Sequence, residues 1–264
     1  MSRTGALIAK EWLDLRRNIG ALVPVGIVTL LSVIVPFAIA IGIPFFTGEA
    51  LSDDPTLERI SAVADPGGVM VGSARIQLFL LQQFLVLFLL TPITGAMSLA
   101  AHAIIGEKQT RTLEPLLATP VTTGELLVAK VLGVLIPTLA ISLAGVVLYL
   151  VGIVALADPG VPAAMLSARS AVLVLLVGPA AALVALQTAL LISSRVNDPR
   201  TAQQFGVLFI VPLMIVLIAQ FGGSLWLSAS MLAAIGLGLI AAWVLLTFLS
   251  IAMFERETIL TRWR

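Results

Sequence analysis

The chain has 264 residues, of which 59% are hydrophobic and 11% charged, with a formal net charge of +1 and a mean hydropathy of +1.12. Soluble domains carry about 25% charged residues, so this composition excludes a water-soluble globular fold. The apolar runs do not alternate with polar residues as the strands of a membrane β-barrel do, and the absence of cysteine excludes disulfides and thiolate metal sites. We therefore predict an all-α polytopic membrane protein.

Six apolar runs are predicted to cross the membrane, each near the ~17–25 residues that a spanning helix uses or somewhat longer. They cover residues 20–46, 76–104, 127–157, 170–193, 205–221 and 229–253. An even number of crossings places both termini on one side. We expect residues 1–264 to form a single transmembrane domain.

The basic residues predict the orientation. Twelve of the 15 Lys and Arg residues fall in the segments on one side, and only Arg59, Arg75 and Arg169 fall on the other. Because cytoplasmic segments carry the excess of positive charge, both termini and the loop at residues 105–126 are predicted to be cytoplasmic. Residues 47–75 are then an extracytoplasmic loop, and the protein is a multi-pass component of the cytoplasmic (inner) membrane.

Residues 1–19 are predicted to form an amphipathic helix ahead of the first span. Ile8, Trp12, Leu15 and Ile19 fall on one face at helical spacing, and basic residues lie on the opposite face. Such a helix lies flat in the membrane interface, with the tryptophan at the depth of the lipid headgroups.

The extracytoplasmic loop has its own start and stop signals. Asp54 followed by Pro55 predicts the start of a short helix, and Asp65-Pro66-Gly67-Gly68 predicts its end. Two interpretations remain open: a solvated cap that closes the ends of the first two spans, or a segment that admits or releases a substrate.

Polar residues follow one side of the second span. They occupy about a third of the helical circumference and are Gln83, Thr91, Thr94, Ser98 and His102. One interpretation is a substrate pathway at a dimer interface. The other is hydrogen bonding to neighbouring helices, which polar residues in spans often do.

Proline occurs in each of the first five spans, where it frees a backbone carbonyl and allows a kink. These prolines are Pro24, Pro36, Pro92, Pro137, Pro179 and Pro212. Small residues at four-residue spacing predict close helix packing in two places. They are Ala181/Ala185/Ala189 and Ala234/Gly238/Ala242.

A polar island separates the second and third spans, at residues 106–125. Thr112 is a suitable N-cap, and Pro115 falls in the first turn, where its missing N–H has no partner to lose. Pro120 ends the helix after about two turns. Thr122 and Glu125 then form a capping box that opens the third span. The island is therefore predicted to be a short helix across the ends of two spans.

This island closely resembles the permease signature of the type-2 ABC transporter family. The matching residues read Gly-Glu-Lys-Gln-Thr-Arg-Thr-Leu-Glu-Pro-Leu-Leu-Ala-Thr-Pro-Val from Gly106, with Glu125-Leu126-Leu127 and Lys130 after them. Residues 193–204 and 254–263 resemble the loop before the fifth span and the C-terminal end of one branch of the family. The resemblance extends over essentially the whole chain.

The resemblance implies a transmembrane subunit that dimerises and docks two ATP-binding subunits through a coupling helix. The residues that would contact the ATPase are Glu107, Lys108, Arg111, Thr112, Leu113, Glu114, Leu116, Leu117, Ala118, Thr119 and Pro120. The leucines suit an apolar groove, and the charges would orient the contact. Residues 1–19 would be the elbow helix that braces this machinery. An interfacial connector and a simple membrane anchor are the alternatives for the two segments.

Several absences limit the chemistry of the chain itself. No phosphate-binding Gly-x-x-x-x-Gly-Lys-Ser/Thr loop occurs, so we expect ATP and Mg²⁺ to bind a separate chain. His102 is the sole histidine, so the usual clusters of metal ligands are missing. We expect no catalytic residue, no cofactor or metal site of the chain's own and no nucleic-acid partner.

The expected function is that of a permease subunit of an ATP-driven exporter, paired with an identical or paralogous permease and in contact with lipid. The alternative is a secondary carrier or channel that works without an ATPase; a scaffold without transport is a third class. Acidic residues are missing from the spans, although proton- or sodium-coupled carriers usually place ionisable groups there. The substrate does not follow from the sequence.

Overall fold

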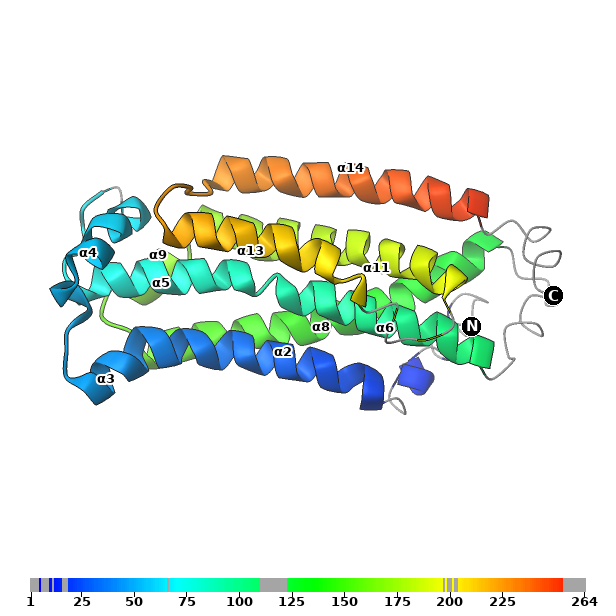
Figure 1. Ribbon diagram of the computed structural model, residues 1–264, viewed down its shortest axis with the longest axis horizontal. Coiled ribbons are helices and arrows are strands. Elements are labelled where there is room, and N and C mark those ends of the chain that lie inside the picture. Colours follow the sequence, from blue (N-terminus) through cyan, green and yellow to red (C-terminus); the bar gives the residue numbers. More distant parts are fainter. Residues whose placement is uncertain are drawn as a thin grey trace.

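The computed structural model describes residues 5, 10, 12–15, 19–65, 67–109, 123–196, 198, 201 and 204–253. Within these ranges all regular structure is helical, and the long helices lie side by side in an elongated bundle (Figure 1). The elements are α2 (Ile19–Phe37), η1 (Ala38–Gly42), α3 (Ile43–Thr47), η2 (Leu51–Asp53), α4 (Pro55–Ser61), η3 (Ala62–Ala64), α5 (Ser73–Leu87), α6 (Leu90–Gln109), α8 (Thr123–Leu156), α9 (Val161–Met165), α10 (Ala168–Val172), η4 (Leu173–Val177), α11 (Gly178–Arg195), α13 (Val207–Phe221) and α14 (Ala229–Met253). We call the end with α4 and α9 the cap end, and the end where α6 stops and α8 starts the loop end.

Five of the six predicted spans appear as helical segments that are long and apolar enough to cross a membrane. They are Ile19–Thr47, Ser73–Ala103, Val128–Leu156, Ala168–Ser193 and Ala229–Ser250. The sixth prediction, residues 205–221, corresponds to α13, which has only 15 residues. At 1.5 Å per residue it is about 22 Å long, shorter than the ~30 Å hydrocarbon core. The described residues thus form only helices, with five segments long and apolar enough to span a membrane and one shorter apolar helix, in agreement with the predicted all-α polytopic fold.

The second predicted span is two helices rather than one. Its helix breaks at Phe88 and Leu89, between α5 and α6. Pro92 explains the break, since its ring crowds the carbonyl four residues earlier, at Phe88, and its nitrogen cannot donate to it. The Phe88 carbonyl instead accepts from Thr91 N at 3.1 Å. The predicted span over residues 76–104 is therefore confirmed as the segment Ser73–Ala103, with an interruption at the proline that was predicted to allow a kink.

Two π-helical turns mark other prolines. The turn η1 ends two residues before Pro44, and η4 ends two residues before Pro179. In η4 the Gly178 N–H reaches the Leu173 carbonyl, five residues earlier. A wider turn makes room for the proline ring without ending the helix. The helical segments therefore continue through these prolines.

The cap end follows its local signals. Asp54 is the N-cap of α4, and its carboxylate accepts from Thr56 N at 2.8 Å and Leu57 N at 3.4 Å. These two backbone donors hold the pKa of Asp54 below its ordinary value. Gly68 turns the chain with φ +62°, and Asp65 accepts from Met70 N. The predicted start of this helix is confirmed, and so is its stop: α4 ends at Ser61 and continues as the 3₁₀ turn η3 to Ala64, directly before Asp65.

The N-terminal segment is described only at residues 5, 10 and 12–15, all of them helical. Leu15 packs against the bundle, while Trp12 is 44% exposed. Ile19 was predicted to end this segment, but it begins α2 and is 70% exposed. Residues 16–18 lie outside the described residues, so the apolar face from Ile8 to Ile19 stays a prediction.

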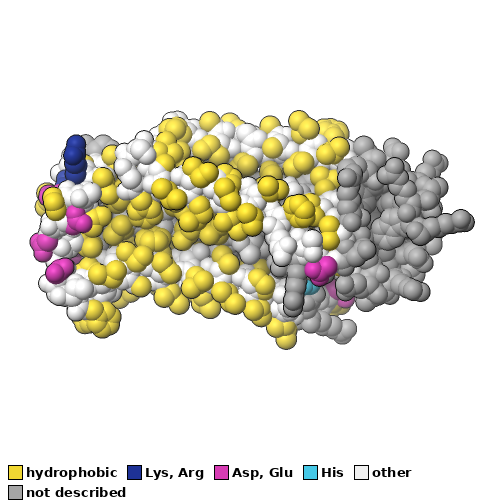
Figure 2. Space-filling model, in the orientation of Figure 1, with side chains coloured by type: hydrophobic (Ala, Val, Ile, Leu, Met, Phe, Trp, Pro, Cys, Tyr) yellow, Lys and Arg dark blue, Asp and Glu magenta, His cyan; other side chains and the backbone are white. Residues whose placement is uncertain are grey.

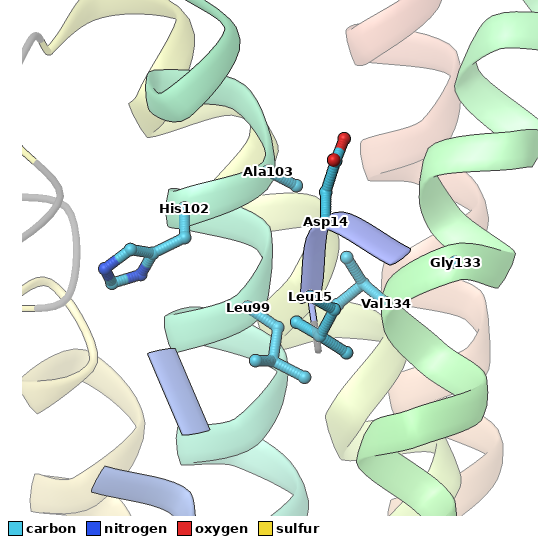
Figure 3. A pocket seen from close by; sticks show the side chains of 7 residues that line it. All are labelled: Asp14, Leu15, Leu99, His102, Ala103, Gly133 and Val134. Carbon is cyan, nitrogen blue, oxygen red and sulfur yellow. The ribbon is translucent and has the colours of Figure 1, made fainter. Parts of the chain in front are cut away.

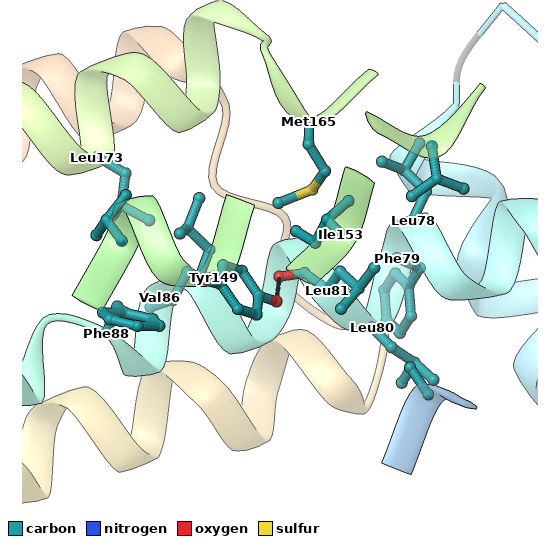
Figure 4. Close-up of a cluster of buried hydrophobic side chains, with 14 of the residues drawn as sticks. Leu78, Phe79, Leu80, Leu81, Val86, Phe88, Tyr149, Ile153, Met165 and Leu173 are labelled. Carbon is teal, nitrogen blue, oxygen red and sulfur yellow. Dashed lines mark hydrogen bonds between the residues drawn. The ribbon is translucent and has the colours of Figure 1, made fainter. Parts of the chain in front are cut away.

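The core of the cap half of the bundle is built around aromatic residues. Tyr149 of α8 is fully buried, and its hydroxyl donates to the Leu81 carbonyl of α5 at 2.8 Å (Figure 4). Phe37 and Phe88 flank its ring, with centroid distances of 5.4 and 5.3 Å. A buried tyrosine needs such an acceptor, so this bond fixes α8 against α5.

The core of the loop half is built largely from alanine. Ala181, Ala185 and Ala189 of α11 are buried against α6 and its neighbours, which confirms the first predicted stripe of small residues. The second stripe, Ala234/Gly238/Ala242 on α14, is exposed in the single chain, so that prediction is wrong within the subunit. The residue of α14 that allows close contact is Gly236, where an added Cβ would lie 2.7 Å from Leu176 Cγ.

The surface separates apolar from charged side chains. Figure 2 shows hydrophobic side chains over the middle of the visible face, with acidic and basic side chains gathered toward the ends. The segment α5–α6 is the most buried of the five long spans, and α14 is the least. This distribution fits a bundle organised around α5 and α6, with apolar side chains over the middle of the visible face.

Candidate functional site

The candidate site lies at the loop end, where the polar island joins the bundle. The helix α6 runs out to Gln109, α8 begins at Thr123, and the two helices pack against each other. The chain therefore leaves and re-enters the bundle at the same end (Figure 1). Glu107 and Lys108 occupy the last turn of α6. The other predicted coupling residues, from Arg111 to Pro120, lie outside the described residues, so the coupling helix stays a prediction.

A buried lysine ties the two flanking helices together. Lys130 of α8 is only 5% exposed, and its Nζ donates to the Ala103 carbonyl of α6 at 3.3 Å. From sequence, Lys130 contributed only to the orientation and to the family pattern. Its apolar surroundings were the one signal for a buried role.

The N-terminal segment packs beside the same two helices. A cavity of about 50 Å³ lies between them, lined by Asp14 and Leu15 of that segment, Leu99 and His102 of α6, and Val134 of α8 (Figure 3). Asp14 also lies 4.0 Å from Lys10. Such a volume holds only a few waters, so this cavity is not a substrate site. It shows instead that the N-terminal segment meets both flanking helices.

His102 faces away from Asp14, on the other side of α6 (Figure 3). Its Nδ1 lies 2.8 Å from the Ser98 carbonyl, one turn earlier in the helix. The described residues contain no group of three or more potential His, Asp or Glu metal ligands.

The five predicted pathway residues do not share one helix face, because Gln83 lies on α5 and the others on α6. Gln83 and Thr91 are fully buried inside the subunit, and their side-chain polar atoms lack partners among the described residues. Ser98 is also buried, and its hydroxyl donates to the Ala21 carbonyl of α2 at 2.9 Å. The last contact favours helix packing for Ser98.

Thr94 and Ser98 line a second cavity, of about 60 Å³, between α6 and the start of α13. Gly206 and Ile210 form its opposite wall. Two of the five predicted residues thus meet an opening between helices. Whether any of the five lines a transport pathway stays a prediction.

Comparison with known families decides the class of the protein. Residues 73–259 match the family described as "ABC-2 family transporter protein". The chain belongs to the ABC-2 transporter family. It is thus the membrane subunit of an ABC transporter, a multi-pass permease. No curated protein matches the chain.

The matched part of this ABC-2 permease begins at Ser73, the first residue of α5, and includes both helices that flank the polar island. The first span and the cap-end loop precede it. The part shared with the family therefore contains the most buried span and the candidate site.

Proposed function

We propose that the protein is the permease subunit of an ATP-driven exporter in the cytoplasmic membrane, with the loop end and both termini in the cytoplasm. Two copies of a separate ABC subunit would bind ATP and Mg²⁺ and dock on the permease. A second permease, identical or paralogous, would complete the transporter. The observation that carries this proposal is the polar island between two helices that are packed and tied together at the loop end.

The contact between Lys130 and Ala103 supports a mechanical role for these helices. A force on residues 110–122 would reach α6 and α8 together, because the buried ammonium resists their separation. The interlocked cap-half core then connects these helices to α5 through Tyr149 and Leu81. Motion of a docked ATPase would thus reach the whole length of the bundle, and substrate would leave along the interface of the two permeases.

The test uses the predicted apolar contact of the coupling helix. The full-length permease, isolated from its native membranes, is expected to bring with it an ATP-hydrolysing subunit. Leu116→Asp and Leu117→Asp together should abolish that association, because two charges cannot enter an apolar groove without partners. Val69→Asp and Val71→Asp form the matched control, since both valines are highly exposed at the cap end.

Retained ATPase association and ATP-dependent activity in the Leu116/Leu117 variant would overturn the proposed coupling site. The carrier or channel alternative makes the opposite prediction for the isolated chain. If that alternative holds, the isolated permease in proteoliposomes without an ATPase transports substrate when driven by an ion gradient alone. Such transport would overturn the exporter proposal.

A further inference from the structure

The cap end contains a buried arginine that has only neutral partners among the described residues. Arg169 is 7% exposed. Its Nε donates to the Leu227 carbonyl at 2.9 Å, and its Nη1 donates to the Gln82 carbonyl and Oε1 at 3.4 and 3.2 Å. Its Nη2 donates to Gln220 Oε1 at 3.1 Å. The guanidinium also lies 4.3 Å from the ring centroid of Trp226, in cation–π geometry.

These contacts join segments that are far apart in the sequence. Gln82 belongs to α5 and Gln220 to the last turn of α13, while Trp226 and Leu227 lie in the connection between α13 and α14. Arg169 itself is on the short helix α10. One side chain therefore holds α5, α10, the end of α13 and the following connection together.

Aromatic rings reinforce the same attachment. Phe221, the last residue of α13, packs edge-on against Phe84 and Phe79 of α5, with centroid distances of 5.6 and 6.3 Å. Trp226 stacks on Phe79 at 6.2 Å. The end of α13 is thus fixed both by hydrogen bonds and by aromatic packing.

The rest of α13 is attached much less firmly. The buried residues of this helix are Leu217 and Gln220, both within its last five positions. Toward its other end, Phe209 packs against the alanine-rich core but is only half-buried, and no residue of α13 before Leu217 is buried. The 60 Å³ cavity separates Ile210 and Gly206 from α6, and closely packed interiors rarely leave such a space. The helix is therefore held at the cap end and loosely packed at the loop end.

We propose that Arg169 is the positioning residue that fixes the cap end of α13, and that α13 tilts about this point toward the cavity beside α6. A buried guanidinium that loses an acceptor keeps its charge and pays the full desolvation cost, so the attachment resists release. The described helix α13, at 15 residues, is also shorter than the hydrocarbon core. Its moving end is the one on the same side of the bundle as the polar island.

The experiment uses nitroxide pairs, which the absence of cysteine allows without further substitution. The cap-end pair is Ile218→Cys with Leu166→Cys, and the loop-end pair is Leu208→Cys with Val128→Cys. All four side chains are well exposed. In the full permease in phosphatidylcholine vesicles, pulsed EPR should give a narrow distance distribution for the cap-end pair and a broad one for the loop-end pair. Equal widths would overturn the inference.

Arg169→Gln should broaden the cap-end distribution to the width of the loop-end one, and Arg169→Lys should have an intermediate effect because it keeps only the charge. Arg75→Gln is the matched control. This arginine also lies at the cap end, but its Nη2 donates to the carbonyl and carboxylate of Glu58, so the substitution should leave the cap-end distribution narrow. If Arg169→Gln fails to fold, Gln220→Leu removes only the acceptor on α13 and should give the same broadening. An unchanged cap-end distribution in the variant that folds would overturn the role of Arg169.

A second variant tests the moving end. Ile210→Phe places a larger side chain at the cavity and should narrow the loop-end distribution while the cap-end pair stays unchanged. A loop-end distribution as broad as that of the wild type would show that α13 does not move into the cavity. These measurements need neither an ATPase nor a substrate, so their failure and a failure of the proposed exporter function are distinguishable.

Discussion

The two halves of the bundle are held together in different ways. In the cap half, besides the Tyr149–Leu81 bond between α8 and α5, polar side chains tie helices to short elements and connections: Arg169 reaches the Leu227 carbonyl, and Asp158 accepts from Ser73 Oγ at 2.7 Å. In the loop half, the polar contacts join long helices to each other, as between Ser98 and Ala21 or between Gln187 and Ser250. Hydrogen bonds in the cap half therefore attach turns and short helices to the bundle, whereas those in the loop half join long helices that approach each other closely.

The apolar packing differs in the same direction. Aromatic rings interlock around Tyr149 in the cap half, while alanines of α11 form much of the contact surface in the loop half. Interlocked rings oppose sliding of one helix along another. Alanine surfaces give close approach with few protrusions, a frequent solution in membrane helices. The half that would receive force from a docked ATPase is thus the half whose helices interlock least.

The largest effect is expected from the aromatic core. Tyr149→Ala removes the ring between Phe37 and Phe88 and the bond to Leu81, and it should lower the free energy of unfolding by about 3–5 kcal/mol. Tyr149→Phe keeps the ring and should cost only about 1 kcal/mol. Unfolding in mixed micelles by SDS titration measures both. Equal losses for the two variants would mean that the hydrogen bond, rather than the ring, dominates this core.

The opposite substitution tests the alanine half. Ala185→Leu forces three extra carbons between fully buried surfaces of α6 and α11, and it should lower the free energy of unfolding by about 1–3 kcal/mol. Ala234→Leu makes the same change at an exposed position of α14 and should stay within about 0.5 kcal/mol. The same SDS titration compares them. A neutral Ala185→Leu would show that the loop half is loosely packed throughout.

These two alanines also show what sequence can and cannot predict. Both belong to stripes with the same four-residue spacing, but Ala185 is buried and Ala234 is exposed. Spacing establishes which residues share a helix face. Which face is covered depends on the positions of other helices, and the pattern does not contain that information. Local signals fared better: Asp54 and Pro55 predict the start of α4 because a cap involves only neighbouring residues.

The candidate site divides in the same way. The polar island and its flanking helices follow from local pattern and family resemblance. The contacts of Arg169 do not, because its acceptors Gln82, Gln220 and Leu227 lie 51 to 87 residues away in the chain. From the sequence alone, Arg169 is only one positive charge in a predicted extracytoplasmic segment. Its role became visible only when the fold brought those acceptors together.

The smallest expected effect concerns the periphery of the cap half, at Asp54. Its folded-state pKa lies below the ordinary value because the carboxylate accepts from Thr56 N and Leu57 N. A lowered folded pKa means that the cap stabilises α4 fully at neutral pH and loses this effect as the pH falls below about 4. Hydrogen exchange at the Thr56 and Leu57 amides, corrected for the intrinsic rates, should show protection that declines in that range.

Asp54→Asn is the matched control, because asparagine caps helices well but does not titrate. In this variant the protection of Thr56 and Leu57 should be independent of pH, while the core around Tyr149 behaves as in the wild type. A decline at the same pH in Asp54→Asn would assign the transition to another carboxylate. A simultaneous loss of protection at Leu81 in the wild type would mean that α4 and the aromatic core around Tyr149 unfold together as one cooperative unit.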